Sequence, residues 1–213
     1  GKLLLGLGDS FTSGGGSRSC PHVAAGLLNW QVRNFAVGGA TTKNILPQLI
    51  NAAAVFPVTT DIVLTIGGND LNGIGSLASV AQLNITLFEQ RAASFKPTLV
   101  STYKQIKATA RPETKIFALP YVDFISVGNG MPYKAESRRI LQALNNCVRD
   151  AATEASTGYI DSVISAFLGH EMNSADPYID NFNHPTNALH SNLKGYAKIG
   201  DVVAAHLQRN GRK

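Results

Sequence analysis

The chain has 213 residues, of which 44% are hydrophobic and 15% are charged, and its formal net charge is +5. Its lysines and arginines are scattered along the chain, which argues against nucleic acid as a partner. No apolar run approaches the roughly 18 residues that a membrane helix needs, and no linker, repeat or low-complexity tract divides the chain. We therefore expect one monomeric domain over residues 1–213, without an integral membrane segment.

Short runs rich in Leu, Val and Ile alternate with longer amphipathic stretches, which is the pattern of βα units around a parallel sheet. Strands are predicted at residues 2–7, 32–37, 61–66, 115–119 and 157–160. Helices are predicted at residues 41–54, 98–110, 133–156 and 193–208. Ligands of such open sheets bind beyond the carboxyl ends of the strands, so the turn after each strand is where chemistry is expected.

The first predicted strand runs into the polar turn Gly8-Asp9-Ser10, which would lift Ser10 to the carboxyl edge of the sheet. A serine there can be a nucleophile if a base accepts its proton and donors hold the oxyanion. A phosphate-binding loop fits poorly, because Phe11 stands where the third glycine of such a loop would be. A plain turn with Asp9 or Ser10 as helix N-cap remains an alternative.

Glycine-rich turns also follow the second and third predicted strands, as Gly38-Gly39 and Gly67-Gly68-Asn69-Asp70. Glycine allows close approach of the backbone, so the Gly39 N–H can point into a site, and the Asn69 amide supplies a side-chain donor. With the Ser10 N–H these groups would form a three-donor oxyanion hole. Each turn alone is a weak signal, and their order at three successive strand ends is a stronger one.

These three turns and a late histidine resemble the four sequence blocks of the SGNH, or GDSL, hydrolases over almost the whole chain. Residues 8–14 and 38–42, together with Phe167-x-Gly169-His170-Glu171 and His190-x-Asn192-x-x-Gly195, are similar to the secreted esterase branch first described in streptomycetes. The resemblance implies a flavodoxin-like α/β three-layer sandwich with strand order 2-1-3-4-5. It further implies a serine esterase without cofactor, whose substrates are small-molecule, lipid or acylated-sugar esters. No metal is expected, because the sequence has neither H-E-x-x-H nor a Cys/His cluster of ligand spacing.

The base must be chosen from the histidines of the chain, which are His22, His170, His184, His190 and His206. The last block of the family has a glycine five residues after its histidine. Gly195 stands in that position after His190, whereas Leu189 stands there after His184. We therefore expect His190 as the base and keep His184 as the alternative. The loop histidine His22 and also His206 are expected to be solvated or packed, and His170 to brace a loop.

The third member of a catalytic triad is not evident in the sequence. In most of the family an aspartate lies three residues before the histidine, and that position is Asn187 here. Asn187 and Asp180 are therefore tentative orienters of the imidazole. In the streptomycete-type branch a main-chain carbonyl can replace the acid, so a carbonyl from residues 187–189 is the favoured partner. Asp9 is expected to stabilise its own turn and not to react.

Cysteine usage and one sequon favour secretion. Cys20 and Cys147 are an even pair, for which we expect a disulfide, with two buried thiols as the alternative. Asn84-Ile85-Thr86 is a glycosylation acceptor. The chain opens almost directly into strand-like sequence, so any signal peptide is expected to have been removed or never present.

A function of a different class also has to be considered. The same fold could serve as a glycan- or lipid-binding module that has kept the family motifs without turnover. Such a module would have lost the nucleophile, the base or an oxyanion donor. Ser10, His190, Gly39 and Asn69 are all present, so the sequence favours the esterase.

Overall fold

The central strands form where the sequence has its continuous apolar runs. The computed structural model describes residues 1–125 and 133–210, and within them the strands are β1 (Leu3–Gly8), β2 (Gln31–Asn34), β3 (Asp61–Thr65), β4 (Lys115–Ala118) and β5 (Gly158–Tyr159). All pairs are parallel and the order is β2-β1-β3-β4-β5, which confirms the predicted topology. β1 and β3 are buried along their whole length, as strands covered on both faces must be.

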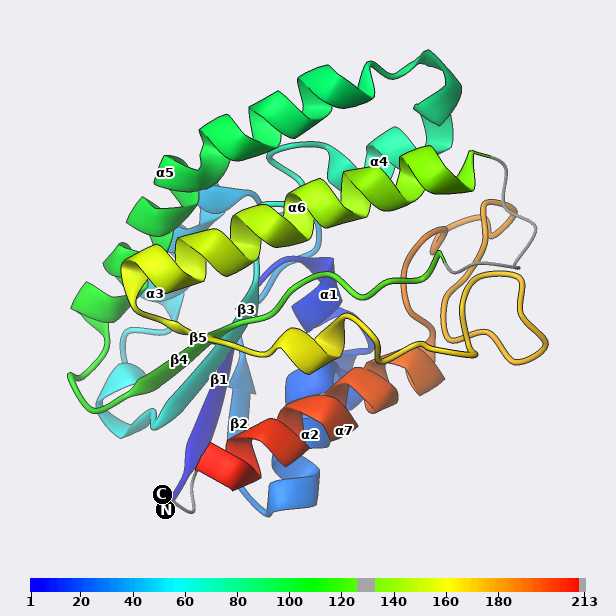
Figure 1. The fold of residues 1–213 in the computed structure, drawn as a ribbon. Coiled ribbons are helices and arrows are strands. Elements are labelled where there is room, and N and C mark those ends of the chain that lie inside the picture. The colour runs from blue at the N-terminus through cyan, green and yellow to red at the C-terminus, as the bar shows by residue number, and fades with distance from the viewer. Residues whose placement is uncertain (126–132, 211–213) are drawn as a thin grey trace.

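Helices cover both faces of this sheet (Figure 1). On one face α2 (Cys20–Leu28) packs against α7 (Leu193–Asn210). On the other, α5 (Ile85–Thr109) packs against α6 (Lys134–Ala155), with α3 (Ile45–Asn51) beside α5. The shorter helical turns are α1 (Ser10–Ser13), η1 (Gly16–Arg18), η2 (Thr42–Asn44), η3 (Phe56–Val58), α4 (Gly73–Ser76), η4 (Leu77–Gln82) and η5 (Asp161–Val163).

Two helices differ from the prediction. The sequence analysis put His22 in a loop, but it lies in α2, whose start is set by the Ser19 side chain accepting from the His22 N–H and by Pro21 in the first turn. α5 begins at Ile85, well before the predicted start at residue 98, and contains Pro97. Proline normally breaks a helix interior, and here packing against α6 outweighs that local preference.

The predicted disulfide between Cys20 and Cys147 is wrong. Cys20 begins α2 and Cys147 lies in α6, so the two residues belong to helices on opposite faces of the sheet (Figure 1). Both are free and buried. A disulfide requires Cα atoms within about 7 Å, and the sheet between the two helices prevents this approach.

Two surface features bear on the other expectations. Asn84 is exposed and caps α5 by accepting from the Leu87 N–H at 3.0 Å, so its glycosylation stays a prediction. Of the helices that the structure describes, none has the length and apolar character needed to span a bilayer.

Candidate active site

The turn that carries Ser10 is shaped by the end of β1. Gly8 has φ 112°, and a Cβ there would lie 2.0 Å from the Thr65 carbonyl oxygen, so only glycine lets β1 and β3 come this close. Asp9 then caps α1 by accepting from the Phe11 N–H at 3.0 Å. Ser10 is the first residue of α1 and is half-buried at the carboxyl edge of the sheet.

His190 meets Ser10 across this edge. Its Nε2 lies 2.9 Å from the Ser10 Oγ, and its Nδ1 lies 2.9 Å from the Ala188 carbonyl oxygen. A carbonyl can only accept, so Nδ1 carries the proton and Nε2 is left to accept from the serine hydroxyl. The Phe11 ring stacks on the imidazole with 5.5 Å between centroids. The histidine is therefore oriented by a main-chain oxygen and an aromatic face.

The two tentative orienters hold the loop around His190. The Asn187 amide donates to the Asp180 carboxylate at 2.9 Å and to the Ser191 carbonyl at 3.0 Å. The Asp180 N–H in turn donates to the His190 carbonyl at 3.0 Å. Within the described residues neither the Asn187 side chain nor the Asp180 carboxylate hydrogen-bonds the imidazole. Leu189, with φ 61°, is kept in a strained conformation by its N–H bond to the Asp180 carbonyl.

His184, the alternative base, is exposed on the same loop. Its Nδ1 accepts from the Asn187 N–H at 2.8 Å and the Thr186 N–H at 3.2 Å, and its Nε2 lies 3.6 Å from the Asp180 carboxylate. Nδ1 of this ring thus closes a turn, and no hydrogen bond joins the ring to Ser10 among the described residues.

The remaining histidines have local partners. His170 stacks on Tyr178 with 3.9 Å between centroids, and its Nδ1 bonds the Asp176 carbonyl at 2.8 Å. His22 bonds the Ser19 hydroxyl at 2.8 Å, and His206 lies edge-on to Phe117. Burial lowers the pKa of both His22 and His206, so these two rings favour the neutral form.

The candidate oxyanion donors lie on neighbouring turns. Gly39 has φ 80°, and a Cβ on Gly38 would lie 3.9 Å from the Ser10 Cβ, so this turn runs beside Ser10. The Asn69 amide donates to the Ala40 carbonyl at 2.9 Å. Within the described part of the chain, the N–H groups of Ser10 and Gly39 have no hydrogen-bond partner, which leaves both available to a ligand.

Side chains further from Ser10 join these turns to one another. The Asp70 carboxylate accepts from the Thr42 N–H at 3.0 Å and from its hydroxyl at 2.7 Å. The Gln48 amide from α3 bonds both the N–H and the carbonyl of Gly8, each at 2.8 Å. The three turns after β1, β2 and β3 are thus held together by buried or half-buried polar bonds.

Asp9 and Tyr121 form a buried polar cluster behind Ser10. The Asp9 carboxylate accepts from the Tyr121 hydroxyl at 2.6 Å, the Thr65 hydroxyl at 2.6 Å and the Phe11 N–H. Burial raises the pKa of Asp9 to about 6, and these three donors oppose the rise. The sequence analysis missed Tyr121, although the turn after β4 was an available signal, since Tyr121 follows that strand closely.

Ser10, Asn69 and His190 line one cavity of about 270 Å³, whereas Gly39 lines a separate one of about 220 Å³. The first is lined by Asp9, Ser10, Phe11, Gly68, Asn69, Asn72, Ile74, Gly75, Tyr121, Ala188, Leu189 and His190. It is a small cavity, since ligand pockets span roughly 300–1,000 Å³. Over residues 1–125 and 133–210, no three His, Cys, Asp or Glu side chains gather as a metal site.

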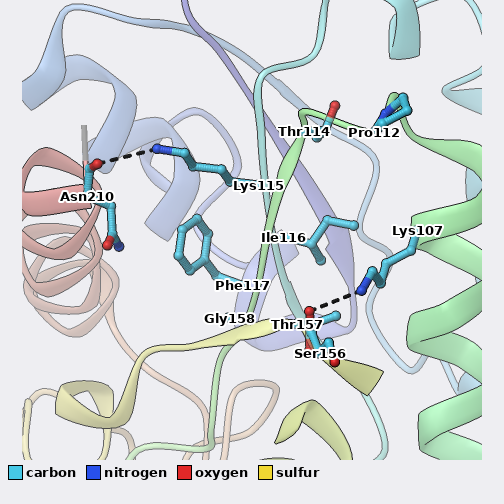
Figure 2. Close-up of a pocket in the computed structure, with 10 residues that line it drawn as sticks. All are labelled: Lys107, Pro112, Thr114, Lys115, Ile116, Phe117, Ser156, Thr157, Gly158 and Asn210. Carbon is cyan, nitrogen blue, oxygen red and sulfur yellow. Dashed lines mark hydrogen bonds between the residues drawn. The ribbon is translucent and has the colours of Figure 1, made fainter. Parts of the chain in front are cut away.

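A larger hollow of about 480 Å³ lies near the amino ends of β4 and β5 (Figure 2). Lys107 and Lys115 line it, but their ammonium groups bond carbonyls at the ends of α6 and α7. Lys107 donates to the Ser156 carbonyl at 3.1 Å and Lys115 to the Asn210 carbonyl at 3.4 Å. The hollow lies at the amino ends of the strands, whereas the turns described above lie at their carboxyl ends. Its larger size therefore does not make it the candidate active site.

Solved structures of known proteins share the fold of this chain. An extracellular lipase from Streptomyces rimosus has 22% sequence identity and a TM-score of 0.77, with 97% of this chain and 99% of that chain covered. Phospholipase A1 from Streptomyces albidoflavus NA297 has 22% identity and a TM-score of 0.74, with coverage of 97% and 98%. The acetylxylan esterase Axe2 from Geobacillus stearothermophilus has 18% identity and a TM-score of 0.60, with coverage of 98% and 93%.

At these identities the similarity shows a common fold. A search of curated protein sequences found no match. A family model, described as the GDSL-like Lipase/Acylhydrolase family, matches residues 7–198. Because this match runs from just before Ser10 to beyond His190 and takes in most of the chain, the protein belongs to the GDSL-like lipase/acylhydrolase, or SGNH hydrolase, family.

Proposed function

We propose that this protein is a serine esterase that hydrolyses carboxylic esters through an acyl-serine intermediate. Ser10 is the nucleophile and His190 is the base. The observation that carries the proposal is the 2.9 Å contact between the His190 Nε2 and the Ser10 Oγ, with the other ring nitrogen held by the Ala188 carbonyl. This geometry matches a nucleophile and base within hydrogen-bond reach, with the base oriented by a third group.

In the first step the Ser10 oxygen forms a bond to the ester carbonyl carbon while its proton passes to the His190 Nε2. The resulting oxyanion accepts from the N–H groups of Ser10 and Gly39 and from the Asn69 amide. The tetrahedral intermediate then breaks its bond to the alcohol oxygen, which takes the proton from His190. Fixed donors that meet charge as it develops supply the largest share of such catalysis.

In the second step water attacks the acyl-serine, with His190 again taking the proton. The Ser10 oxygen then leaves, takes the proton back and releases the carboxylic acid. The Ala188 carbonyl keeps the imidazole in one tautomer throughout. It carries no full charge, so the imidazolium is stabilised by a dipole where a triad would use a carboxylate.

The substrate class and the location are extensions of this proposal. The fold is shared with proteins named as an extracellular lipase, a phospholipase A1 and an acetylxylan esterase, which supports acylated lipids or sugars as substrates and supports secretion. A monomer and glycan attachment at Asn84 remain predictions. The contact between Ser10 and His190, and the N–H groups of Ser10 and Gly39 that have no partner among the described residues, favour the esterase over the alternative binding module.

The test is ester hydrolysis by the wild type and by Ser10→Ala, His190→Ala and the matched control His184→Ala. A panel of p-nitrophenyl esters, phospholipids and acetylated polysaccharides identifies the substrate, and labelling by a fluorophosphonate reports the nucleophile. Ser10→Ala and His190→Ala should both fall to background, since nucleophile and base act as one unit. His184→Ala should keep most of the activity. Activity of Ser10→Ala within tenfold of the wild type would refute the assignment of Ser10 as the nucleophile.

A further inference from the structure

Tyr121 joins the nucleophile turn to the turn that carries Asn69. It follows β4 and is only 1% exposed. Its hydroxyl donates to the Asp9 carboxylate at 2.6 Å and accepts from the Gly68 N–H at 2.9 Å. Asp9 directly precedes Ser10, and Gly68 directly precedes Asn69. One hydroxyl therefore lies between the two residues that flank the nucleophile and the oxyanion amide.

The direction of these bonds is determined by the chemistry of the groups. A phenol has one proton, and it donates that proton in a hydrogen bond to the Asp9 carboxylate. The phenol oxygen is then left to accept from the Gly68 N–H. Burial and the neighbouring Asp9 raise the pKa of Tyr121 well above its ordinary value, which keeps the phenol protonated. The Tyr121 hydroxyl thus both donates and accepts, a role that phenylalanine cannot fill.

The contact with Tyr121 also explains why residue 68 is a glycine. A Cβ on Gly68 would lie 2.9 Å from the Tyr121 oxygen and from the ring carbon that carries it. The absence of a side chain is what lets the phenol reach the backbone N–H.

The Tyr121 ring continues the same arrangement towards the base. It lies edge-on to Phe11, with 5.1 Å between centroids, and Phe11 stacks on His190. The hydroxyl end of Tyr121 therefore supports the two turns, and its ring supports the aromatic side chain that covers the imidazole.

We propose that Tyr121 is a positioning residue, whose hydroxyl, bonded to Asp9 and Gly68, holds Ser10 and the Asn69 amide in the register that lets both meet one ester carbonyl. This deepens the proposed function and depends on it. Tyr121 acts through its two partners and not on the reacting atoms, because its hydroxyl is directed to Asp9 and the Gly68 backbone. Asn69 supplies the donor, and Tyr121 fixes where that donor lies.

The experiment replaces the hydroxyl alone, with Tyr121→Phe. Its control is Tyr159→Phe, which removes a phenol from half-buried β5. Tyr121→Phe should lower kcat for a p-nitrophenyl ester by about tenfold or more while KM changes less than about threefold, as expected for support realised in the transition state. Tyr159→Phe should match the wild type. An equal loss in both variants, a kcat within twofold of the wild type, or a change in KM alone overturns the proposal.

Two further measurements separate positioning from simple packing. NMR hydrogen exchange of the Gly68 amide should accelerate in Tyr121→Phe and stay unchanged in Tyr159→Phe, since only the first variant removes its acceptor. The double variant Tyr121→Phe with Asn69→Ala should lose less kcat than the product of the single losses, because both act on the same donor. Full additivity, or an unchanged Gly68 amide, overturns the proposal.

The amide measurement does not need turnover. A wild-type protein that hydrolyses no ester of the panel would refute the proposed function, and the exchange of the Gly68 amide would still report whether Tyr121 holds that turn. Active wild type with an unaffected Tyr121→Phe variant refutes the positioning role alone.

Discussion

Asn187 stands where most of the family has an aspartate, and its contacts explain why an acid would not serve here. Its amide donates to the Asp180 carboxylate and to the carbonyls of His190 and Ser191. All three partners are acceptors. An aspartate at this position would offer them no proton and would place a second carboxylate beside Asp180, which is unfavourable.

We therefore predict that Asn187→Asp is less active than Asn187→Ala, although the substitution restores the family residue. Asn187→Ala should lose well under the roughly 10⁴-fold that follows loss of the orienting group in a true triad, because the Ala188 carbonyl still holds the imidazole. Steady-state kcat and KM of the two variants are the measurement. An Asn187→Asp variant that is as active as Asn187→Ala, or more active, would contradict this account of the loop.

The raised pKa of the buried Asp9 carboxyl is expected to make the stability of the protein depend on pH. Burial, the largest cause, raises its pKa from 3.8 to about 6. Above about pH 6 the carboxylate is charged in both the folded and the unfolded chain. Between about pH 6 and 3.8 the folded protein takes up a proton that the unfolded chain does not, so the contribution of Asp9 to stability rises as the pH falls.

The measurement is the free energy of unfolding of the wild type and of Asp9→Asn, by urea, from pH 7 to pH 4. The difference between the two should move in favour of the wild type by about 2 to 3 kcal/mol over this range, since one pKa unit corresponds to about 1.4 kcal/mol. Titrating groups that do not interact with Asp9 are common to both proteins and cancel. A difference that stays constant with pH would show that Asp9 does not titrate as described.

At the scale of elements, one side chain of α3 hydrogen-bonds the end of β1. Gln48 is 3% exposed and bonds the N–H and the carbonyl of Gly8 with its two amide atoms. This bond pair ends the strand directly before Asp9 and Ser10. An amide is needed because the same side chain must donate and accept.

Gln48→Ala should lower the free energy of unfolding by about 1 to 3 kcal/mol, because the buried Gly8 N–H loses its side-chain acceptor while the Gly8 carbonyl keeps only the Val37 N–H. Asn51→Ala, at the exposed end of the same helix, is the matched control and should change it by less than about 0.5 kcal/mol. Urea unfolding of both variants is the check. Equal stability of the two would mean that Gly8 is satisfied in another way.

The helices also show the limit of local patterns. The apolar face of α6 was predicted from its spacing, and Ile140, Leu144 and Val148 are buried in the structure. The first half of α5 was missed because Pro97 interrupts the helical pattern, and α2 was missed because it is short and begins with a turn-like Cys-Pro pair. In both cases contacts with another helix outweigh the local signal.

At the scale of the molecule, the two helical layers keep the cysteines apart. Cys20 and Cys147 are 0% and 5% exposed, and burial raises the pKa of Cys147 to about 11 and that of Cys20 to about 12. A buried protonated thiol reacts slowly. We predict that thiol titration of the unreduced protein finds two thiols after denaturation and almost none before it. A denatured, unreduced sample without free thiols would show that Cys20 and Cys147 are joined by a disulfide after all.

The sequence by itself determined the parallel sheet and the positions of its strands, and the resemblance to the SGNH hydrolases implied the strand order. Strands buried on both faces must be continuous apolar runs, and such runs can be seen without knowing what packs on them. From this, Ser10, Gly39 and Asn69 could be assigned to three strand ends that meet at one edge. Their roles in catalysis remain predictions for the experiments above.

Only the tertiary structure decided which groups touch. It alone could show that the Ala188 carbonyl bonds the imidazole, that Tyr121 lies between Asp9 and Gly68, and that the cysteines belong to opposite layers. These pairings join residues far apart in the chain or depend on the backbone path of a single loop. Local residue patterns determine where an element forms, but the face of the sheet on which it packs and the direction of its polar atoms depend on the packing of the whole chain.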